Sequence, residues 1–125
     1  MKLNFLHLCD IAFFSQEGKL NVIGVFDRMM SKDFPAISSF CLVLGISGNK
    51  GNFKLRAEIV HSETNERVLE IKQDSIEIKE DGGSANFVAK LLGVSFKRDG
   101  KYLIKVYIDE KPVNNDHSLV FEKYS

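Results

Sequence analysis

The two-residue alternation of apolar and polar side chains along residues 53–61 is the feature that most constrains the fold. The two sets are Phe53, Leu55, Ala57 and Ile59 on one side, and Lys54, Arg56 and Glu58 on the other. Because successive side chains of a β-strand point to opposite faces, this pattern predicts a half-buried strand. Residues 101–109 repeat the alternation, although Leu103 and Tyr107 make the outer face of that strand partly apolar.

Two other segments are apolar on both faces, residues 20–26 and residues 40–46. This composition is typical of central strands that are covered on both sides. Gly24 and Gly45 lie in the middle of the two runs, where the missing side chain predicts a bulge or the close approach of another backbone.

Turn residues separate these strands at short intervals. The turns fall at residues 16–18, 48–51, 81–83, 98–100 and 109–112, and weaker strand patterns fill residues 68–72, 76–79 and 119–124. The sequence therefore predicts an all-β chain, with residues 1–125 forming a single domain. The expected architecture is a two-layer antiparallel β sandwich of roughly eight strands, immunoglobulin-like in general arrangement.

Residues 84–96 fit two interpretations. Ser84 could cap a helix, and the apolar residues that follow have helical spacing: Phe87, Val88, Leu91 and Leu92. Gly93 and the β-branched Val94 oppose a helix. We expect an extended strand, with a short helix over part of the segment as the alternative.

Charge and hydropathy exclude several classes of function. Lys plus Arg and Asp plus Glu both number 17, so the net charge favours neither nucleic acid nor an anionic membrane. No apolar run approaches the length of a membrane-spanning helix, and the first ten residues lack the features of an export signal. We therefore expect a cytoplasmic protein, with Cys9 and Cys41 reduced and buried; a disulfide between them is the alternative.

Residues 18–28 read Gly-Lys-Leu-Asn-Val-Ile-Gly-Val-Phe-Asp-Arg, after an Asp-aromatic stretch at residues 10–14 and before the pair Phe34 and Pro35. Together with the Gly-Lys-Tyr of residues 100–102, this pattern resembles a family of small uncharacterised bacterial proteins. The resemblance implies a small β sandwich and a domain of unknown function. It supplies no catalytic residues.

Polar residues near the apolar run at 20–26 are candidates for ordering loops or contacting a ligand. Asp27 and Arg28 close this run, and a carboxylate beside a guanidinium could order the next loop through backbone N–H groups or bind a charged molecule. Asn21 interrupts the run, and a buried amide would need partners, so it is expected to tie one strand or loop to another.

No catalytic or metal constellation is recognisable. His7, His61 and His117 lack the close spacing of a zinc site, and no nucleophile elbow or phosphate-binding loop is present. The acidic loop residues are mostly single, each beside glycine or lysine, as in ordinary turns: Asp33, Asp81, Asp99, Asp109 and Asp116. We expect no catalytic residues, no metal and no cofactor.

The preferred function is a non-catalytic interaction module that binds another protein or itself, with a homodimer as one expected state. The expected contact is an apolar patch of Val60, Leu103 and Tyr107, or an exposed strand edge. The competing hypothesis is a metal-dependent enzyme or a calcium-tuned module that uses His61 or His117 with a loop carboxylate.

Overall fold

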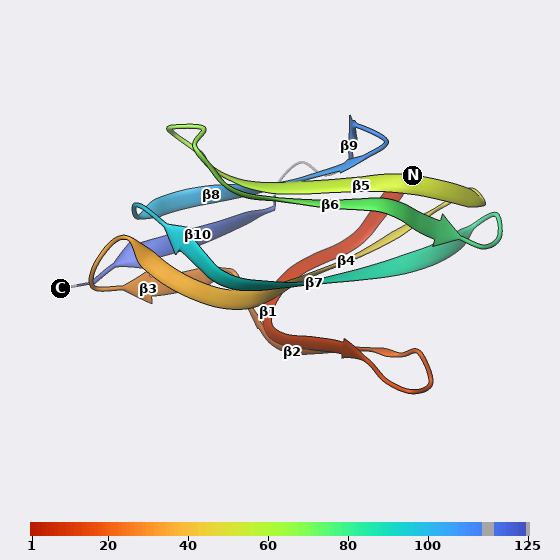
Figure 1. The fold of residues 1–125 in the computed structure, drawn as a ribbon, viewed down its shortest axis with the longest axis horizontal. Helices are drawn as coiled ribbons and strands as arrows, with labels where there is room; N and C mark the ends of the chain where they lie inside the picture. The colour runs from red at the N-terminus through yellow and green to blue at the C-terminus, as the bar shows by residue number, and fades with distance from the viewer. Residues whose placement is uncertain (114–116, 125) are drawn as a thin grey trace.

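A computed structural model describes residues 1–113 and 117–124, and this part of the chain forms ten strands in two sheets (Figure 1). The strands are β1 (Lys2–Phe14), β2 (Leu20–Phe26), β3 (Arg28–Ser31), β4 (Ala36–Gly48), β5 (Gly51–His61), β6 (Arg67–Ile78), β7 (Gly83–Phe96), β8 (Gly100–Ile108), β9 (Lys111–Pro112) and β10 (Ser118–Lys123). One sheet has the order β2-β1-β4-β7, and the other has the order β3-β10-β8-β5-β6, with β9 beside β8. Within the described residues, no helix is long and apolar enough to cross a membrane.

The all-β prediction and the two sheets are confirmed, and several details are corrected. There are ten strands rather than roughly eight. β3 and β10 run parallel, so the sandwich is not wholly antiparallel, and the immunoglobulin-like arrangement is not confirmed. Residues 84–96 lie in β7, which confirms the strand and removes the helix alternative.

The main core lies between the two sheets. Alternate residues of β4 face it from one side, and those of β5 and β8 face it from the other. The fully buried residues from these strands include Leu42, Leu44, Ile46, Ala57, Ile59 and Val106. Phe96 and Tyr102 add an aromatic cluster at one end, with ring centres 5.2 Å apart. The half-buried strand predicted at residues 53–61 therefore places its apolar side as expected.

β4 is buried on both faces, as predicted for residues 40–46. Its other face carries Cys41 and Val43, which form a second, smaller core with Cys9 of β1. Gly45 is required on this face, because a Cβ there would come within 2.3 Å of the Phe5 ring. The group that approaches Gly45 is therefore a side chain, and not the backbone that the sequence analysis expected.

The second core is covered by the hairpin of β1 and β2. Ala12 and Val22, which are register partners in this hairpin, pack against the cluster of Cys9, Cys41 and Val43. In Figure 1, β1 is bent, and its second half runs with β2 below the other strands. The hairpin therefore covers the outer face of its own sheet.

The prediction that residues 20–26 form a central strand is wrong. β2 is the edge of its sheet and pairs only with β1 among the described strands. One of its faces packs on the second core, while Ile23 and Val25 are more than half exposed. Gly24 has φ +74 and touches the Asp10 side chain, which agrees with the irregularity expected at this glycine.

Replacing Leu42 by alanine tests the main core. Leu42 is fully buried, so Leu42→Ala should lower the free energy of unfolding by about 2–5 kcal/mol, measured by urea titration. Ile37→Ala is the matched control, because Ile37 lies on the same strand but is two-thirds exposed. Its effect should stay within about 0.5 kcal/mol, and equal losses for the two variants would contradict this packing.

Candidate functional site

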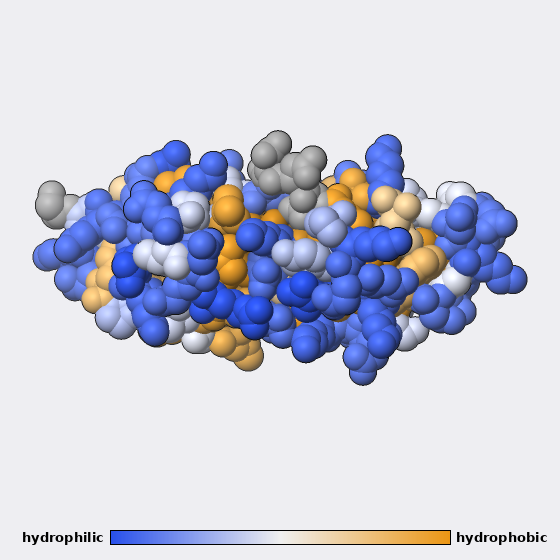
Figure 2. All heavy atoms as spheres, turned by 90° about the horizontal axis from the view of Figure 1, so that it is seen from above, coloured by the Kyte–Doolittle hydropathy of each residue, from blue (hydrophilic) through white to orange (hydrophobic). Residues whose placement is uncertain are grey.

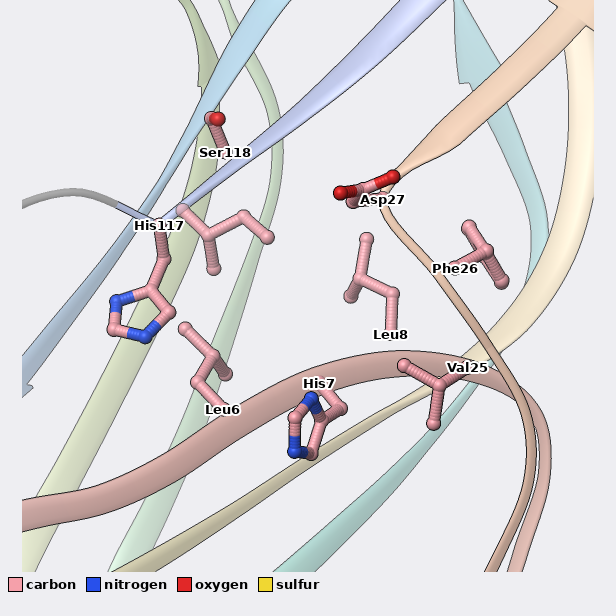
Figure 3. Close-up of a pocket in the computed structure, with 9 residues that line it drawn as sticks. Leu6, His7, Leu8, Val25, Phe26, Asp27, His117 and Ser118 are labelled. Atoms are coloured by element: carbon pink, nitrogen blue, oxygen red, sulfur yellow. The ribbon is translucent and has the colours of Figure 1, made fainter.

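An open cleft of about 430 Å³ lies where β1 and β2 diverge from β8 and β10. Its apolar lining comes from Leu6, Leu8, Val25, Phe26 and Ile104, and its polar groups come from His7, Asp27, His117 and Ser118 (Figure 3). The cleft joins an apolar floor to a few polar side chains, which is the usual composition of a ligand pocket.

The cleft brings together two residues that the sequence analysis assigned to different hypotheses, Asp27 and His117. Figure 3 shows their side chains on different walls, with His117 beside the start of β10 and Asp27 after β2. Main-chain bonds fix both positions, because the Asp27 carbonyl accepts from Val120 and the His117 carbonyl accepts from Ile104, each at 2.9 Å. Among the described residues, no three His, Cys, Asp or Glu side chains gather as metal ligands.

Arg28 and Asn21 do not enter the cleft. Arg28 begins β3 and forms an ion pair with Glu122 of β10, so it joins these two parallel strands. The residues after Asp27, which were expected to form a loop, begin with β3. The Asp27 carbonyl accepts a hydrogen bond from the Val120 amide, so the main chain just before β3 is bound to β10. Asn21 donates only locally, to the Lys19 carbonyl at 3.2 Å.

His61 is part of the framework. Its Nε2–H donates to the Asp99 carbonyl at 3.0 Å, while its Nδ1 accepts from the Glu63 and Thr64 amides at 3.2 and 3.4 Å. This pattern assigns the ring proton to Nε2 and uses both nitrogens. His61 therefore ties the end of β5 to the β7–β8 turn and has no nitrogen left for a metal.

The Tyr102 side chain completes the same corner. Its hydroxyl donates to the Arg98 carbonyl, and its ring lies perpendicular to His61 at 5.0 Å. Burial raises the pKa of Tyr102 above the usual value for tyrosine. The hydroxyl therefore stays protonated and able to donate over the whole physiological pH range.

The patch predicted from Val60, Leu103 and Tyr107 is not an open apolar surface. Val60 and Leu103 are register partners, but Val60 is only 5% exposed. The Arg56 guanidinium lies 4.0 Å from the Tyr107 ring centre and covers it. Tyr107 also donates to Glu58 at 3.4 Å, so charged groups occupy this face.

These charged groups form a network on the outer face of β5 and β6. Arg56 contacts three carboxylates at 3.1–3.7 Å, those of Glu58, Glu70 and Glu110. Arg67 joins Glu58 and Glu70 at 3.1 and 3.2 Å. The hydrogen bond to Glu110 raises the pKa of Arg56 above its usual value. Each charged group of this network therefore has a partner of opposite charge, and none of these residues is left unpaired for catalysis.

The acidic loop residues accept hydrogen bonds that hold turns and neighbouring strands. Asp81 accepts from the Lys50 amide and Asp109 from the Lys54 amide, each at 2.9 Å. Asp33 and Asp99 act through main-chain carbonyls, which accept from Ser31 and His61. Asp116 lies outside the described residues. The calcium hypothesis therefore finds no cluster of these groups in residues 1–113 and 117–124.

The largest feature missed by the sequence analysis is the outer side of the β1–β2 hairpin. Ile11 and Ile23 are register partners, and Phe13 lies two residues further along β1. These three side chains, called here the hairpin face, are 46–54% exposed. The sequence signal for this face was two apolar segments, residues 11–14 and 20–26, separated by a short turn. In the structure, a hydrogen bond of 2.8 Å from the Ser15 amide to the Lys19 carbonyl closes this turn.

Cys9 and Cys41 lie directly opposite each other on β1 and β4, and both are free thiols in the structure. Their exposed fractions are 0% and 2%. Burial raises the pKa of the Cys9 thiol, and the neighbouring Cys41 and Asp10 raise it further. Both thiols are therefore shielded, and Cys9 is unreactive as a nucleophile in the folded chain.

A family model covers most of the chain. The family of unknown function DUF6941 matches residues 4–117, and the chain therefore belongs to this family. No match was found among curated proteins.

Gly100→Ala tests the role of His61. Gly100 has φ +124, and a Cβ there would lie 2.7 Å from His61 Nε2, so alanine must displace the ring as well as strain the backbone. Gly82→Ala is the control, because Gly82 also has a positive φ but open space around it. We expect a loss of about 1–2 kcal/mol for the control and a larger loss for Gly100→Ala in urea unfolding. Equal losses would show that His61 is not held as described.

Alkylation tests the thiol pair. In the folded chain at pH 8, iodoacetamide should modify neither cysteine, because both are buried and the raised pKa of Cys9 keeps its thiolate population low. In urea, mass spectrometry should find both thiols modified. Rapid labelling of the folded chain, or a mass that lacks two free thiols after unfolding, would contradict this state.

Proposed function

We propose that this member of the DUF6941 family is a non-catalytic, cytoplasmic protein-binding module that docks through the hairpin face. The observation that carries the proposal is the exposure of Ile11, Phe13 and Ile23 on one side of an edge hairpin. Large apolar side chains offer on the order of 200 Å² each, so three half-exposed ones leave roughly 300 Å² of apolar surface. Contiguous apolar patches of this size on soluble proteins commonly mark a contact.

The hairpin has two apolar sides, and only one is used by the fold. Ala12 and Val22 on the inner side cover the second core. The outer side adds nothing to that core, yet it keeps two isoleucines where a solvated hairpin would normally carry polar residues. Retention of these side chains in water favours a partner that covers them.

The outer face of the six-stranded sheet provides the contrast. Figure 2 shows this side of the molecule as mostly hydrophilic, and the ion pairs of Arg56 and Arg67 lie on it. Leu103 and Tyr107, the remaining members of the patch predicted from sequence, sit beside these ion pairs. Desolvating such charges would cost free energy, so this face is the weaker candidate for docking.

The cytoplasmic location rests on the thiols. Cys9 and Cys41 face each other at register positions and are unbonded, which suits a reducing compartment. The competing metal-dependent or calcium-tuned function has one point of support, the shared position of Asp27 and His117 at the cleft. His61, its other candidate, is occupied by main-chain bonds.

Photo-crosslinking tests the proposal. A photoreactive amino acid replaces Ile23 on the hairpin face or, as the control, Lys72 on the charged outer face of β6, where the side chain is also more than half exposed. In cells of the source organism, irradiation should give a protein adduct at position 23 and none at position 72.

Competition makes the readout specific. Added unlabelled wild-type chain should suppress the adduct at position 23, whereas the Ile11→Asp chain should not, because a buried carboxylate at the contact is unfavourable. Adducts of equal strength at both positions, or suppression by both competitors, would refute docking through the hairpin face.

A further inference from the structure

We propose that the cleft between β1, β2, β8 and β10 binds a small organic amine, a molecule with an apolar body and one positively charged nitrogen. This inference goes beyond the proposed function, because the cleft lies at the base of the β1–β2 hairpin and shares no residue with the hairpin face. Three properties of the cleft support it: the sign of its charge, the place of its exposed apolar side chains, and its volume.

The charge at the cleft is negative. With histidine neutral at pH 7, Asp27 carries the only formal charge among the described residues that line it. Within residues 1–113 and 117–124, no hydrogen bond or ion pair engages the Asp27 carboxylate. The neighbouring Arg28 is paired with Glu122 instead. The carboxylate is therefore available to a cationic ligand and repels an anionic one.

The exposed apolar side chains of the cleft lie beside this carboxylate. Val25 and Phe26 directly precede Asp27 in the chain and line the same cleft, and Val25 is 56% exposed. The floor is already packed and has exposed fractions of only 3–7%: Leu6, Leu8 and Ile104. A ligand that covers Val25 and Phe26 removes apolar surface from water without opening this floor. The apolar body of the amine therefore belongs against Val25 and Phe26, with its nitrogen at Asp27.

The other polar groups of the cleft suit a donor-rich ligand. Ser118 has a hydroxyl oxygen that accepts hydrogen bonds, and the neutral imidazole of His7 has one acceptor nitrogen. The His7 ring stacks on Phe5, with ring centres 5.8 Å apart, which restricts its orientation. In Figure 3, Ser118 and His7 lie on different sides of the Leu6 and Leu8 side chains. An ammonium group has three donors and no acceptor, so it matches these oxygens and nitrogens better than a carboxylate or phosphate does.

The size of the cleft favours an organic cation over a metal ion. Its volume of about 430 Å³ lies in the range of small-molecule pockets. A metal ion needs several ligands close together, and the described residues contain no suitable group of three His, Cys, Asp or Glu side chains. Because Asp27 is exposed and stays solvated, its contact with an amine is weak. We expect a dissociation constant on the order of 1 mM for a small aromatic amine.

An NMR titration of the isotope-labelled full chain tests this inference. The probe is phenethylamine, which is positively charged at pH 7, and its neutral analogue phenethyl alcohol has the same apolar body. The amine should shift the amide signals of residues 25–27 and 117–118 in a saturable way. The alcohol should bind about fivefold more weakly, because it lacks the charge that Asp27 attracts.

Two asparagine variants separate the cleft from the rest of the surface. Asp27→Asn removes the charge and keeps the shape of the side chain, so it should weaken the amine about fivefold and leave the alcohol unchanged. Asp74→Asn is the matched control, because Asp74 is also exposed but lies on β6 in the other sheet. It should leave the affinity for both ligands unchanged. Circular dichroism establishes that each variant is folded.

A cation placed in the cleft gives a second test. Val25→Lys sets an ammonium group beside Asp27, where it should compete with the amine and weaken its binding. Because Val25 is more than half exposed, the longer side chain extends into solvent and leaves the core intact. Unchanged amine affinity in this variant would place the bound nitrogen away from Asp27 and overturn the proposal.

The remaining outcomes are equally decisive. Saturable shifts at the cleft that weaken in Asp27→Asn, but not in Asp74→Asn, would support the amine site. Equal affinity for amine and alcohol, equal losses in both asparagine variants, or no saturable shift at about ten times the expected dissociation constant would overturn it. The crosslink at position 23 does not involve the cleft, so the proposed function stands or falls separately.

Discussion

The packing of the β1–β2 hairpin against the outer face of β4 determines most of what is distinctive in this molecule. Ala12 and Val22 cover Cys41 and Val43, so that β4 is buried on both sides. The same folding back opens the cleft beside β8 and β10 and leaves the opposite side of the hairpin in water. The second core, the cleft and the hairpin face are therefore products of one contact between a strand pair and its own sheet.

The strands with a regular pattern of apolar residues could be predicted from the sequence, but the position of β2 at the edge of its sheet could not. The alternation along residues 53–61 and the uniform apolarity of residues 40–46 correspond directly to β5 and the middle of β4. Residues 20–26 have the same apolarity, but a sequence does not say whether the covering surface belongs to the same chain. The assumption that all apolar faces are covered internally turned an edge strand into a predicted central one.

The missed elements and sites have related causes. β1 is interrupted by Asn4, His7 and Asp10, which lie exposed on a strand that also carries buried leucines, so its pattern is less regular than that of β5. The cleft joins Asp27 with His117, and only the pairing of β10 with both β3 and β8 brings these residues near each other. Asn21 was expected to tie one strand or loop to another, but its side chain donates to the Lys19 carbonyl only two residues away, because β2 is an edge strand and leaves the amide near solvent.

The position of β10 between β3 and β8 has a consequence for biosynthesis. β3 is made well before β10, the strand that pairs with it, so β3 must wait with unsatisfied backbone groups until residues 118–123 leave the ribosome. Phe121, which fills the gap beside Phe34 and Phe96, arrives at the same moment. Closure of the larger sheet thus depends on residues 118–123, and a nascent chain stalled before this point would expose a strand edge and aromatic core residues to chaperones and aggregation partners alike.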